Sequence, residues 1–467
     1  KVLLESGRQR ATSSPTLAPP LKAQLLQYIG QAQVNMSDRK GADQSLAEAA
    51  RIYEQLGEPR ARYRVMLDQA DNALAMGHHQ EALDLVERIA SSQARDAKDA
   101  LLTGRLTKAR GTVAMFRGDW QAAKGYFDQY LESAKAHEDW DAASLVEVLL
   151  SQATVASRYG NDLPGARDLI EQAIRTFQIH PELPIALKMD ALNYRQSVAN
   201  DWGQFAAVER VSSPDVTECD RRLSPESQPC LKLKIGLLGA LLKLGKVEAA
   251  NSKGNDLLSM LDPSSPRDQL VATSILVRAM ARSSRHEQLP ALVKKLQDIA
   301  LAQKGEPLDA VYRFVAMSTL AESYILTDQP EDALRWVTQA DALMKDDPSV
   351  PPLAARKTRL LEGVALHLIG QDERALNAMS HFCSPENQPT RMTYVMDHYF
   401  SLNCVAPLTA IGRPDAALSL LKKAVPILND NLGPASPTAQ RAQRWLDSVT
   451  STGHVPRMSS PGDALFG

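Results

Sequence analysis

The sequence contains few aromatic residues and almost no excess of charge of either sign. Aromatic side chains make up 5% of the 467 residues, whereas alanine and leucine are abundant, and this composition favours close-packed helices over a β-sandwich. The 53 basic and 55 acidic residues leave a net charge of −2. A chain without a basic surplus has no field to attract nucleic-acid phosphates, so nucleic acid is not an expected partner.

Long hydrophobic runs are also missing. The longest uninterrupted apolar segment, residues 235–242, spans eight residues, whereas a membrane-spanning helix needs about 18 or more. We therefore expect this segment to be part of a buried helix. No secretory leader is visible. The chain starts at Lys1 rather than at methionine, inside a segment with a helical pattern, and we expect it to be a fragment of a longer protein.

Motifs for catalysis and cofactor binding are lacking as well. The dipeptide Gly245-Lys246 has no upstream glycine of a phosphate-binding loop, and no glycine-rich dinucleotide motif follows a strand-like segment. We therefore expect no catalytic residue, no metal site and no cofactor in this chain. The densest group of potential metal ligands matches no zinc-binding spacing, and it consists of His381, Cys383, His398 and Cys404.

The sequence does contain a regular series of short breaks, each followed by the start of a helix. The intervals between successive breaks are 41, 42, 43, 42, 40, 43, 42 and 42 residues. A period this constant indicates a stack of helical hairpins. A tenth, weaker unit has its turn near Arg39. The nine breaks lie at Gly77, Gly118, Gly160, Gly203, Gly245, Arg285, Asp328, Gly370 and Gly412.

Small residues recur seven positions before and five positions after the breaks, and large apolar residues recur nine positions after them. Small side chains let two antiparallel helices approach closely across a short turn, and glycine at the break suits a helix end that needs a positive φ angle. The small residues are Ala70, Gly111, Ala153, Ala321 and Gly363 before the turn, and Ala82, Ala123, Ala250, Ala333, Ala375 and Ala417 after it. The large ones are Val86, Phe127, Leu169, Val337 and Leu421.

These patterns predict an all-α fold: a right-handed α-solenoid of about ten helical hairpins, closed by a C-terminal capping helix. The expected parts are a lead-in helix and proline-rich loop over residues 1–19, an N-terminal array over 20–216, a link over 217–229, a C-terminal array with the capping helix over 230–450, and a flexible tail over 451–467.

The four cysteines form two local pairs. Cys219 and Cys230 flank a link that is rich in proline and serine, and Cys383 precedes Cys404 by 21 positions. Random placement of four cysteines would seldom give two pairs this close, so we expect two disulfides, which would imply an oxidising compartment. The alternative is four buried thiols that behave as small hydrophobic side chains.

The concave side of such a superhelix is the expected binding surface, and the first helix of each hairpin lines it. Asn and Ser side chains in a row can pair with the main chain of an extended peptide, although simple solvation of these side chains is the alternative. Counting three, six and ten residues back from the turns gives the candidate peptide-binding positions: Met115, Thr112 and Lys108 in the third unit, and Asn200, Ser197 and Asn193 in the fifth.

The repeat pattern resembles the tetratricopeptide repeat, in which a small residue, a turn and an alanine recur within a helix-turn-helix unit. The resemblance covers roughly residues 20–450, and the period exceeds the usual 34-residue unit by about eight residues. This spacing is similar to that of the variant found in kinesin light chains and bacterial signalling proteins. The segment from Leu432 to Thr438 is similar to that variant's Leu-Gly-x-x-x-Pro-x-Thr link.

The N-terminal stretch carries a second resemblance. Residues 3–7 (Leu-Leu-Glu-Ser-Gly) and 20–30 are similar to the entry into the repeat array of bacterial serine/threonine protein kinases. In that family a cytoplasmic kinase domain precedes a single membrane span and a C-terminal tetratricopeptide region. The resemblance implies that this chain is a sensor or docking region, located in the periplasm and joined to the membrane only through a missing upstream span. No kinase motif lies in the chain itself.

The expected function is therefore non-catalytic binding of a protein or peptide in signal transduction, with self-association as a further option. Two alternatives stay open. The same arrays occur behind DNA-binding domains in bacterial transcription activators, and a stand-alone scaffold would assemble other proteins. A cytoplasmic location is the alternative to the periplasm.

Overall fold

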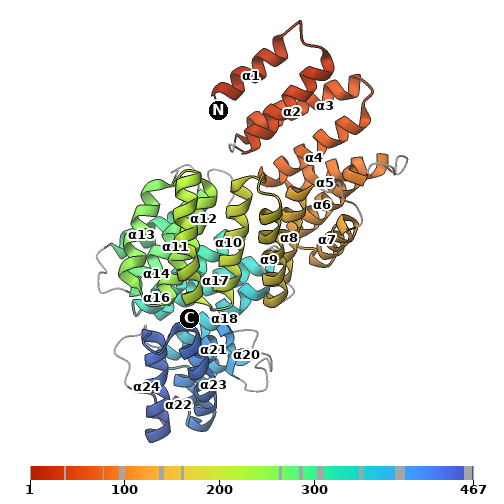
Figure 1. The fold of residues 1–467 in the computed structure, drawn as a ribbon. Helices are drawn as coiled ribbons and strands as arrows, with labels where there is room; N and C mark the ends of the chain where they lie inside the picture. Colours follow the sequence, from red (N-terminus) through yellow and green to blue (C-terminus); the bar gives the residue numbers. More distant parts are fainter. Residues whose placement is uncertain are drawn as a thin grey trace. The chain divides into compact units, whose positions relative to one another are not determined.

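The computed structural model describes residues 2–35, 38–76, 78–93, 100–135, 141–158, 162–261, 266–282, 288–301, 310–346, 350, 352–383, 395–456 and 465. Every regular element among these residues is a helix, and consecutive helices pack as antiparallel hairpins that follow one another along the chain (Figure 1). The predicted fold class, an all-α solenoid of stacked hairpins with a C-terminal capping helix, is confirmed. The expected turns at Gly77, Gly160 and Arg285 lie outside the described residues.

The chain divides into two compact units, Lys1–Val155 and Ala156–Gly467, which we call unit 1 and unit 2. Unit 1 contains α1 (Val2–Ser13), α2 (Pro19–Asn35), α3 (Arg39–Gln55), α4 (Pro59–Met76), α5 (His79–Gln93), α6 (Ala100–Phe116), α7 (Trp120–Lys135) and most of α8 (Ala142–Arg158).

Unit 2 begins within α8 and contains the remaining hairpins. Its N-terminal helices are α9 (Leu163–Ile179), α10 (Ile185–Asp201), α11 (Phe205–Arg222), α12 (Gln228–Lys243), α13 (Val247–Met260), α14 (Pro266–Arg282), α15 (Leu289–Leu301) and α16 (Ala310–Leu326). Its C-terminal helices are α17 (Pro330–Asp346), α18 (Pro352–Leu368), α19 (Asp372–Ala378), α20 (Ser380–Cys383), α21 (Val395–Ser401), the 3₁₀ turn η1 (Leu402–Cys404), α22 (Val405–Ala410), α23 (Pro414–Leu432) and the capping helix α24 (Pro437–Thr452).

The break residues end their helices in the left-handed conformation that the sequence predicts for them. Such a φ angle is almost free for glycine and strained for other residues. One break without glycine, Asp328, adopts a φ of 61° all the same, and aspartate is among the residues that tolerate this region best. The glycines with this geometry are Gly118, Gly203, Gly245, Gly370 and Gly412, with φ between 75° and 85°.

The small residues around the turns let the paired helices approach closely. Ala123 and Ala417 are fully buried. At Gly111 on α6 an added Cβ would lie 2.5 Å from the ring of Phe127 on α7, and Phe127 is itself completely buried. The glycine therefore leaves the room that the aromatic ring fills. This contact is the pairing of small and large positions that the repeat pattern predicts.

The link between the two predicted arrays is shorter than expected. The sequence analysis placed a link at residues 217–229, but α11 continues to Arg222 and α12 begins at Gln228. Pro214 lies inside α11, where a proline costs one backbone hydrogen bond. Ser212 and Cys219 on the same helix are completely buried, and this packing keeps the helix intact beyond the proline. The described units also meet at residue 155 rather than in this link.

The last hairpins depart from continuous helices. Residues 372–383 form α19 and α20 in place of one long helix, and residues 395–410 form α21, η1 and α22. The sequence also predicts proline-containing links at residues 345–352 and 384–390. Residues 347–349, 351 and 384–390 of these links lie outside the described residues. In the predicted tail, Leu465 is buried and its carbonyl accepts a hydrogen bond of 2.8 Å from Arg441 on α24.

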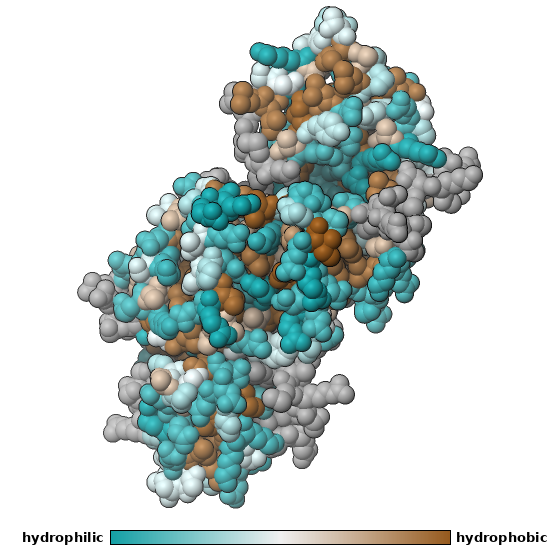
Figure 2. Space-filling model, in the orientation of Figure 1, coloured by the Kyte–Doolittle hydropathy of each residue, from teal (hydrophilic) through white to brown (hydrophobic). Residues whose placement is uncertain are grey.

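Most of the surface in Figure 2 is hydrophilic, with apolar side chains scattered between polar ones in unit 2. Apolar side chains gather over the end of unit 1 that carries α1 and α2. The residues concerned are exposed leucine and tyrosine side chains, as expected at the open end of a stack of hairpins: Leu3, Leu21, Leu25 and Tyr28.

Candidate binding surface on the first helices of the hairpins

The first helices of successive hairpins pack side by side. In unit 2 these are α10, α12, α14, α16 and α18, and in unit 1 they include α2, α4 and α6. We call the surface on which their polar side chains meet the first-helix face. Because one repeat is about 42 residues long, a side chain on this face meets one that lies roughly 40 positions further along the chain. Lys232 on α12, for example, donates to Asp190 on α10 across 3.1 Å.

In unit 1 the first-helix face carries a row of acidic and basic side chains that interact with one another. Asp68 on α4 accepts hydrogen bonds from Gln27 and Gln31 on α2, at 2.8 and 3.0 Å. Its other oxygen accepts from Arg105 on α6 at 2.7 Å. The carboxylate is 9% exposed. Three consecutive first helices are thus joined through one buried acid whose hydrogen bonds are all made.

Lys108, one of the predicted binding residues, belongs to this row. Its ammonium forms an ion pair with Glu147 on α8, and Asp71 on α4 lies close enough to act on it. Burial works against the charged form, but the attraction of Asp71 and Glu147 prevails and raises the pKa of Lys108 above its usual range. Burial, and then the repulsion of Glu147, also raises the pKa of Asp71, against the attraction of Lys108. Lys108 is therefore already neutralised by acids of the same face.

The other two candidates of the third unit lie apart from the charges. The Thr112 hydroxyl donates to the Lys108 backbone carbonyl at 3.1 Å. Met115 is partly buried against the apolar cluster that contains Phe127. Neither contact tests a role in ligand binding, so both residues remain candidates from the sequence alone.

The three candidates of the fifth unit lie together on α10. Asn200 donates through Nδ2 to the carbonyl of Gly236 on α12 at 3.1 Å, and its Oδ1 is buried without a partner among the described residues. Asn193 and Ser197 are half-buried. Among the described residues neither of them makes a side-chain hydrogen bond, so both side chains are available to another molecule.

A group of charged residues that the sequence analysis did not single out lies on the first-helix face of unit 2. Glu322 on α16 is 5% exposed, and its Oε1 lies 2.8 Å from Arg282 Nη2 on α14. Its Oε2 lies 3.3 Å from Arg278 Nε and 3.2 Å from Lys357 Nζ on α18. Lys243, at the end of α12, acts on the same carboxylate without bonding to it. We call these five residues the Glu322 cluster.

The Glu322 cluster contains more positive than negative charge. Burial, together with the repulsion of Arg282, Lys357 and Arg278, lowers the pKa of Lys243 to about 7, although Glu322 pulls it upward. For the same reasons the pKa of Lys357 falls to about 8. Although burial favours its neutral form, the surrounding cations hold the pKa of Glu322 well below its usual range. The carboxylate thus stays charged while two of its lysines are close to losing their protons at neutral pH.

The counting rule used for the peptide-binding candidates would have found part of this cluster. Arg282 lies three residues before the break at Arg285, and Glu322 lies six residues before the break at Asp328. The predicted candidates come from the third and fifth units only. Lys243, Arg278 and Lys357 stand at other offsets, and only the packing of the helices brings them to the same carboxylate.

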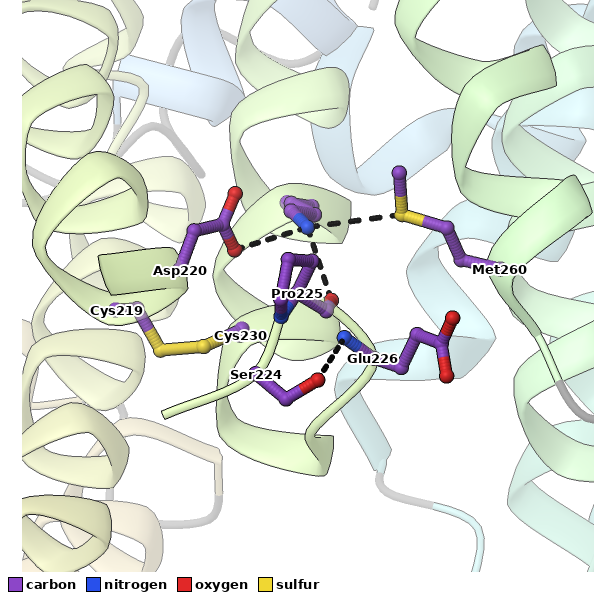
Figure 3. The surroundings of a disulfide bond; sticks show 8 residues. Cys219, Asp220, Ser224, Pro225, Glu226, Cys230 and Met260 are labelled. Atoms are coloured by element: carbon purple, nitrogen blue, oxygen red, sulfur yellow. Dashed lines mark hydrogen bonds and ion pairs between the residues drawn. A yellow bond between two sulfur atoms is a disulfide. The ribbon is translucent and has the colours of Figure 1, made fainter. Parts of the chain in front are cut away.

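The first cysteine pair joins the end of α11 to the start of α12 (Figure 3). Cys219 and Cys230 are bonded, with an S–S distance of 2.00 Å, and both are completely buried. Lys234 on α12 lies 3.0 Å from Asp220 and donates to the Pro225 carbonyl at 2.9 Å. The disulfide and this lysine together fasten the short link to the following helix.

The second cysteine pair joins the two interrupted helices. Cys383 ends α20, and Cys404 ends the 3₁₀ turn η1, where it is completely buried; their S–S distance is 1.99 Å. Because both cysteines stand at the ends of short helical elements, the bond does not have to cross the interior of a continuous helix. Of the four potential metal ligands that the sequence groups together, the two cysteines are thus bonded to each other. Among the residues that the structure describes, no three His, Cys, Asp or Glu side chains form a metal-binding group.

No protein-family model matches the chain, and no curated protein matches it in sequence. Solved structures do share its fold. A Rap protein complexed with Competence and Sporulation Factor matches 83% of this chain and 98% of its own, with 12% sequence identity and a TM-score of 0.52. NprR in complex with its cognate peptide NprX matches 79% of this chain and 99% of its own, with 11% identity and a TM-score of 0.53. Both are solenoids of tetratricopeptide-like repeats, so the resemblance to that repeat is confirmed at the level of the fold.

The expected location in the periplasmic region of a membrane protein is wrong. It depended on the kinase resemblance and its membrane span, and the comparisons give that resemblance no support. A span requires about 20 predominantly apolar residues in one helix. In the part of the chain that the structure describes, no helix combines that length with that apolarity.

Proposed function

We propose that this chain is a non-catalytic receptor for an extended peptide or protein segment, which binds on the first-helix face. The observation that carries the proposal is a row of polar side chains on one first helix, α10, whose hydrogen-bonding groups are not all paired. On α10 these are Asn193 and Ser197, which make no side-chain hydrogen bond with a described residue, and the buried Oδ1 of Asn200. Side-chain amides and hydroxyls in this arrangement suit the main chain of an extended peptide.

The fold gives this proposal support of a second kind. The Rap protein structure is a complex with Competence and Sporulation Factor, and the NprR structure is a complex with its cognate peptide NprX. A stack of hairpins offers a long surface built from equivalent positions, which fits a ligand that is itself a chain of equivalent units. Conformational change in such a stack accumulates from small rotations between neighbours, so ligand binding can bias a linked protein.

A selection from a random heptapeptide library on the purified chain tests the proposal. We expect enriched peptides whose affinity falls at least about tenfold in the double variant Asn193→Ala/Ser197→Ala, because two hydrogen bonds to a desolvated ligand are lost. The matched control is Ser252→Ala/Asn255→Ala, which removes the same two side-chain types from exposed positions of α13. Failure to enrich any peptide, or equal affinities for both double variants, contradicts the proposal.

The protein that the receptor controls is a further hypothesis. Control of a linked serine/threonine kinase is supported only by the resemblance of residues 3–30 to the entry of kinase repeat arrays. Kinase motifs in the coding sequence upstream of Lys1 would support it. A DNA-binding helix pair there would favour a transcription activator, and neither feature would leave a scaffold. Self-association, the other expected interaction, is measured as the mass in solution by light scattering.

A further inference from the structure

We propose that the Glu322 cluster is a subsite for a carboxylate of the peptide ligand, held between Lys243, Lys357 and the two arginines. This inference deepens the proposed function and rests on it. It gives the ligand a chemical class, an acidic peptide, and it gives the first-helix face of unit 2 a second role beside that of Asn193, Ser197 and Asn200.

The cluster has an excess of positive charge and a hydrogen-bond donor without a described acceptor. A single described carboxylate faces four described cations, and both of its oxygens are already shared, Oε1 by Arg282 and Oε2 by Arg278 and Lys357. Lys243 has no hydrogen bond or ion pair with any residue that the structure describes. Its ammonium therefore has three donors for an incoming acceptor.

The cations are the accessible members of the cluster. Glu322 is 5% exposed, whereas the side chains of Arg278 and Arg282 are each 21% exposed and that of Lys357 is 31% exposed. Lys243 is half-buried. A ligand that reaches this surface therefore meets positive groups with Glu322 behind them. Partial burial strengthens the attraction for an anion, because solvent screens it less than at an open surface.

Elsewhere on the same face, several cations each pair with a single acid. Lys232 pairs with Asp190 and Arg356 with Asp397, at 3.1 and 2.7 Å. In unit 1, Asp68 is bound by Arg105. If these charges served only to join the hairpins, fewer cations would suffice to pair with Glu322. The cluster contains four cations for one carboxylate. The lowered pKa of Lys243 and of Lys357 agrees with this reading, since both would regain their protons beside a second carboxylate.

The position of the cluster favours a peptide as the carrier of this carboxylate. Lys243 lies on α12, which packs directly against α10 with its unused Asn193 and Ser197. A ligand held by main-chain hydrogen bonds on α10 can extend along successive first helices and reach α12 and α14. The expected ligand is thus an extended peptide that carries Asp, Glu or its own terminal carboxylate.

The experiment is the heptapeptide selection, carried out with the library in two forms, one amidated and one with a free C-terminal carboxylate. The chain is tested as wild type, Lys243→Met, Lys357→Met and the control Lys253→Met, an exposed lysine of α13. We expect acidic peptides to be enriched on wild type and on the control. By fluorescence anisotropy, affinity should fall at least about tenfold for either cluster variant, and equally when the acid of the peptide becomes Gln. Enrichment in the amidated form assigns a side-chain carboxylate, and enrichment only in the free form assigns the terminal one.

Two outcomes overturn the inference, and they can be told apart. Peptides that lack an acid and bind the cluster variants as tightly as wild type would refute the carboxylate subsite and leave the proposed function standing. No enriched peptide in either form would refute both. A folding defect can be recognised separately, because Lys243→Met removes a cation without a described partner and should keep the helical circular dichroism of wild type and a thermal midpoint no lower than that of wild type.

Discussion

At the scale of single residues, the packing of small side chains against large ones decides how closely two helices of a hairpin approach. Gly111 is the clearest case, because the added Cβ would lie 2.5 Å from Cε1 of Phe127. Phe127 is completely buried, and interiors of proteins are close-packed, so its ring cannot move away without disturbing its neighbours. Overfilling a packed site of this kind costs about 1–3 kcal/mol.

The variant Gly111→Val should therefore lower the thermal midpoint of the protein. The matched control is Gly125→Val on α7, where an added Cβ meets no atom within 4 Å. Both variants change the intrinsic helix propensity in the same way, so the difference between their midpoints in a melting experiment measures the contact with Phe127. Equal midpoints for the two variants would show that the hairpin tolerates a wider separation of α6 and α7.

At the scale of elements, Glu322 joins α16 to α14 and α18. The charged form of Lys243 on α12 is destabilised by burial and by the neighbouring cations. In the unfolded chain a lysine titrates near its usual pKa of about 10.4, whereas the folded value of Lys243 is about 7. Between these two values the unfolded state binds more protons than the folded state. Linkage then requires stability to rise with pH through this window.

We expect the thermal midpoint of the wild type to increase from pH 7 toward pH 10 because of Lys243, and Lys357 contributes in the same direction. The groups that act on Lys243 are Glu322, Arg282, Lys357 and Arg278. In Lys243→Met the midpoint should be higher at pH 7 and the increase with pH smaller than in wild type. An unchanged slope would mean that Lys243 keeps its ordinary proton affinity in the folded chain.

The disulfides also act at the scale of elements, since each closes a short segment between two helices. Removing the pair with Cys219→Ala/Cys230→Ala should lower the free energy of unfolding by about 2–4 kcal/mol, as for other short disulfide loops. The measurement is the denaturant midpoint, compared with that of wild type under non-reducing conditions. An unchanged midpoint would assign the stability of the α11–α12 junction to packing and to Lys234 alone.

The oxidation state itself is read from the intact mass. After denaturation and alkylation without a reductant, we expect no cysteine to react, because all four sulfurs are bonded in the structure. Prior reduction serves as the control and should expose four thiols. Four reactive thiols before reduction would support buried free cysteines instead.

At the scale of the whole molecule, a stack of hairpins transmits a local perturbation mainly to its neighbours in the stack. Both disulfides lie in unit 2, at residues 219–230 and 383–404. Reduction should therefore speed amide hydrogen exchange in α11, α12 and α20–α23. The same treatment should leave α2–α5 of unit 1 unchanged. Faster exchange throughout unit 1 would show that the chain unfolds as one cooperative body.

Much of the fold could be predicted from the sequence, because the breaks and small residues act locally. A glycine that ends a helix needs only its own φ angle, and five of the nine breaks show that angle at glycine. Ala123 and Gly111 mark helix contacts inside one hairpin. The limits of α11 could not be predicted this way, because Pro214 argues locally for a break, while burial of Ser212 and Cys219 keeps the helix together.

The binding surface could be predicted only in part. The expected positions on α10 do lie on the first-helix face, since the offset from the turn determines which side of a helix a residue occupies. Lys108 has the right offset as well, but Glu147 on the next first helix neutralises it. An offset within one helix contains no information on the charge that the neighbouring helix presents.

By itself the sequence determined the repeat period, the helical class and the two cysteine pairs, because each depends on spacing along the chain. Tertiary structure alone decided the composition of the Glu322 cluster. Its members come from four helices, Lys243 on α12, Arg278 and Arg282 on α14, Glu322 on α16 and Lys357 on α18. Electrostatic attraction and pKa values depend on distance in space and on burial, and both arise only when hairpins far apart in the sequence pack side by side.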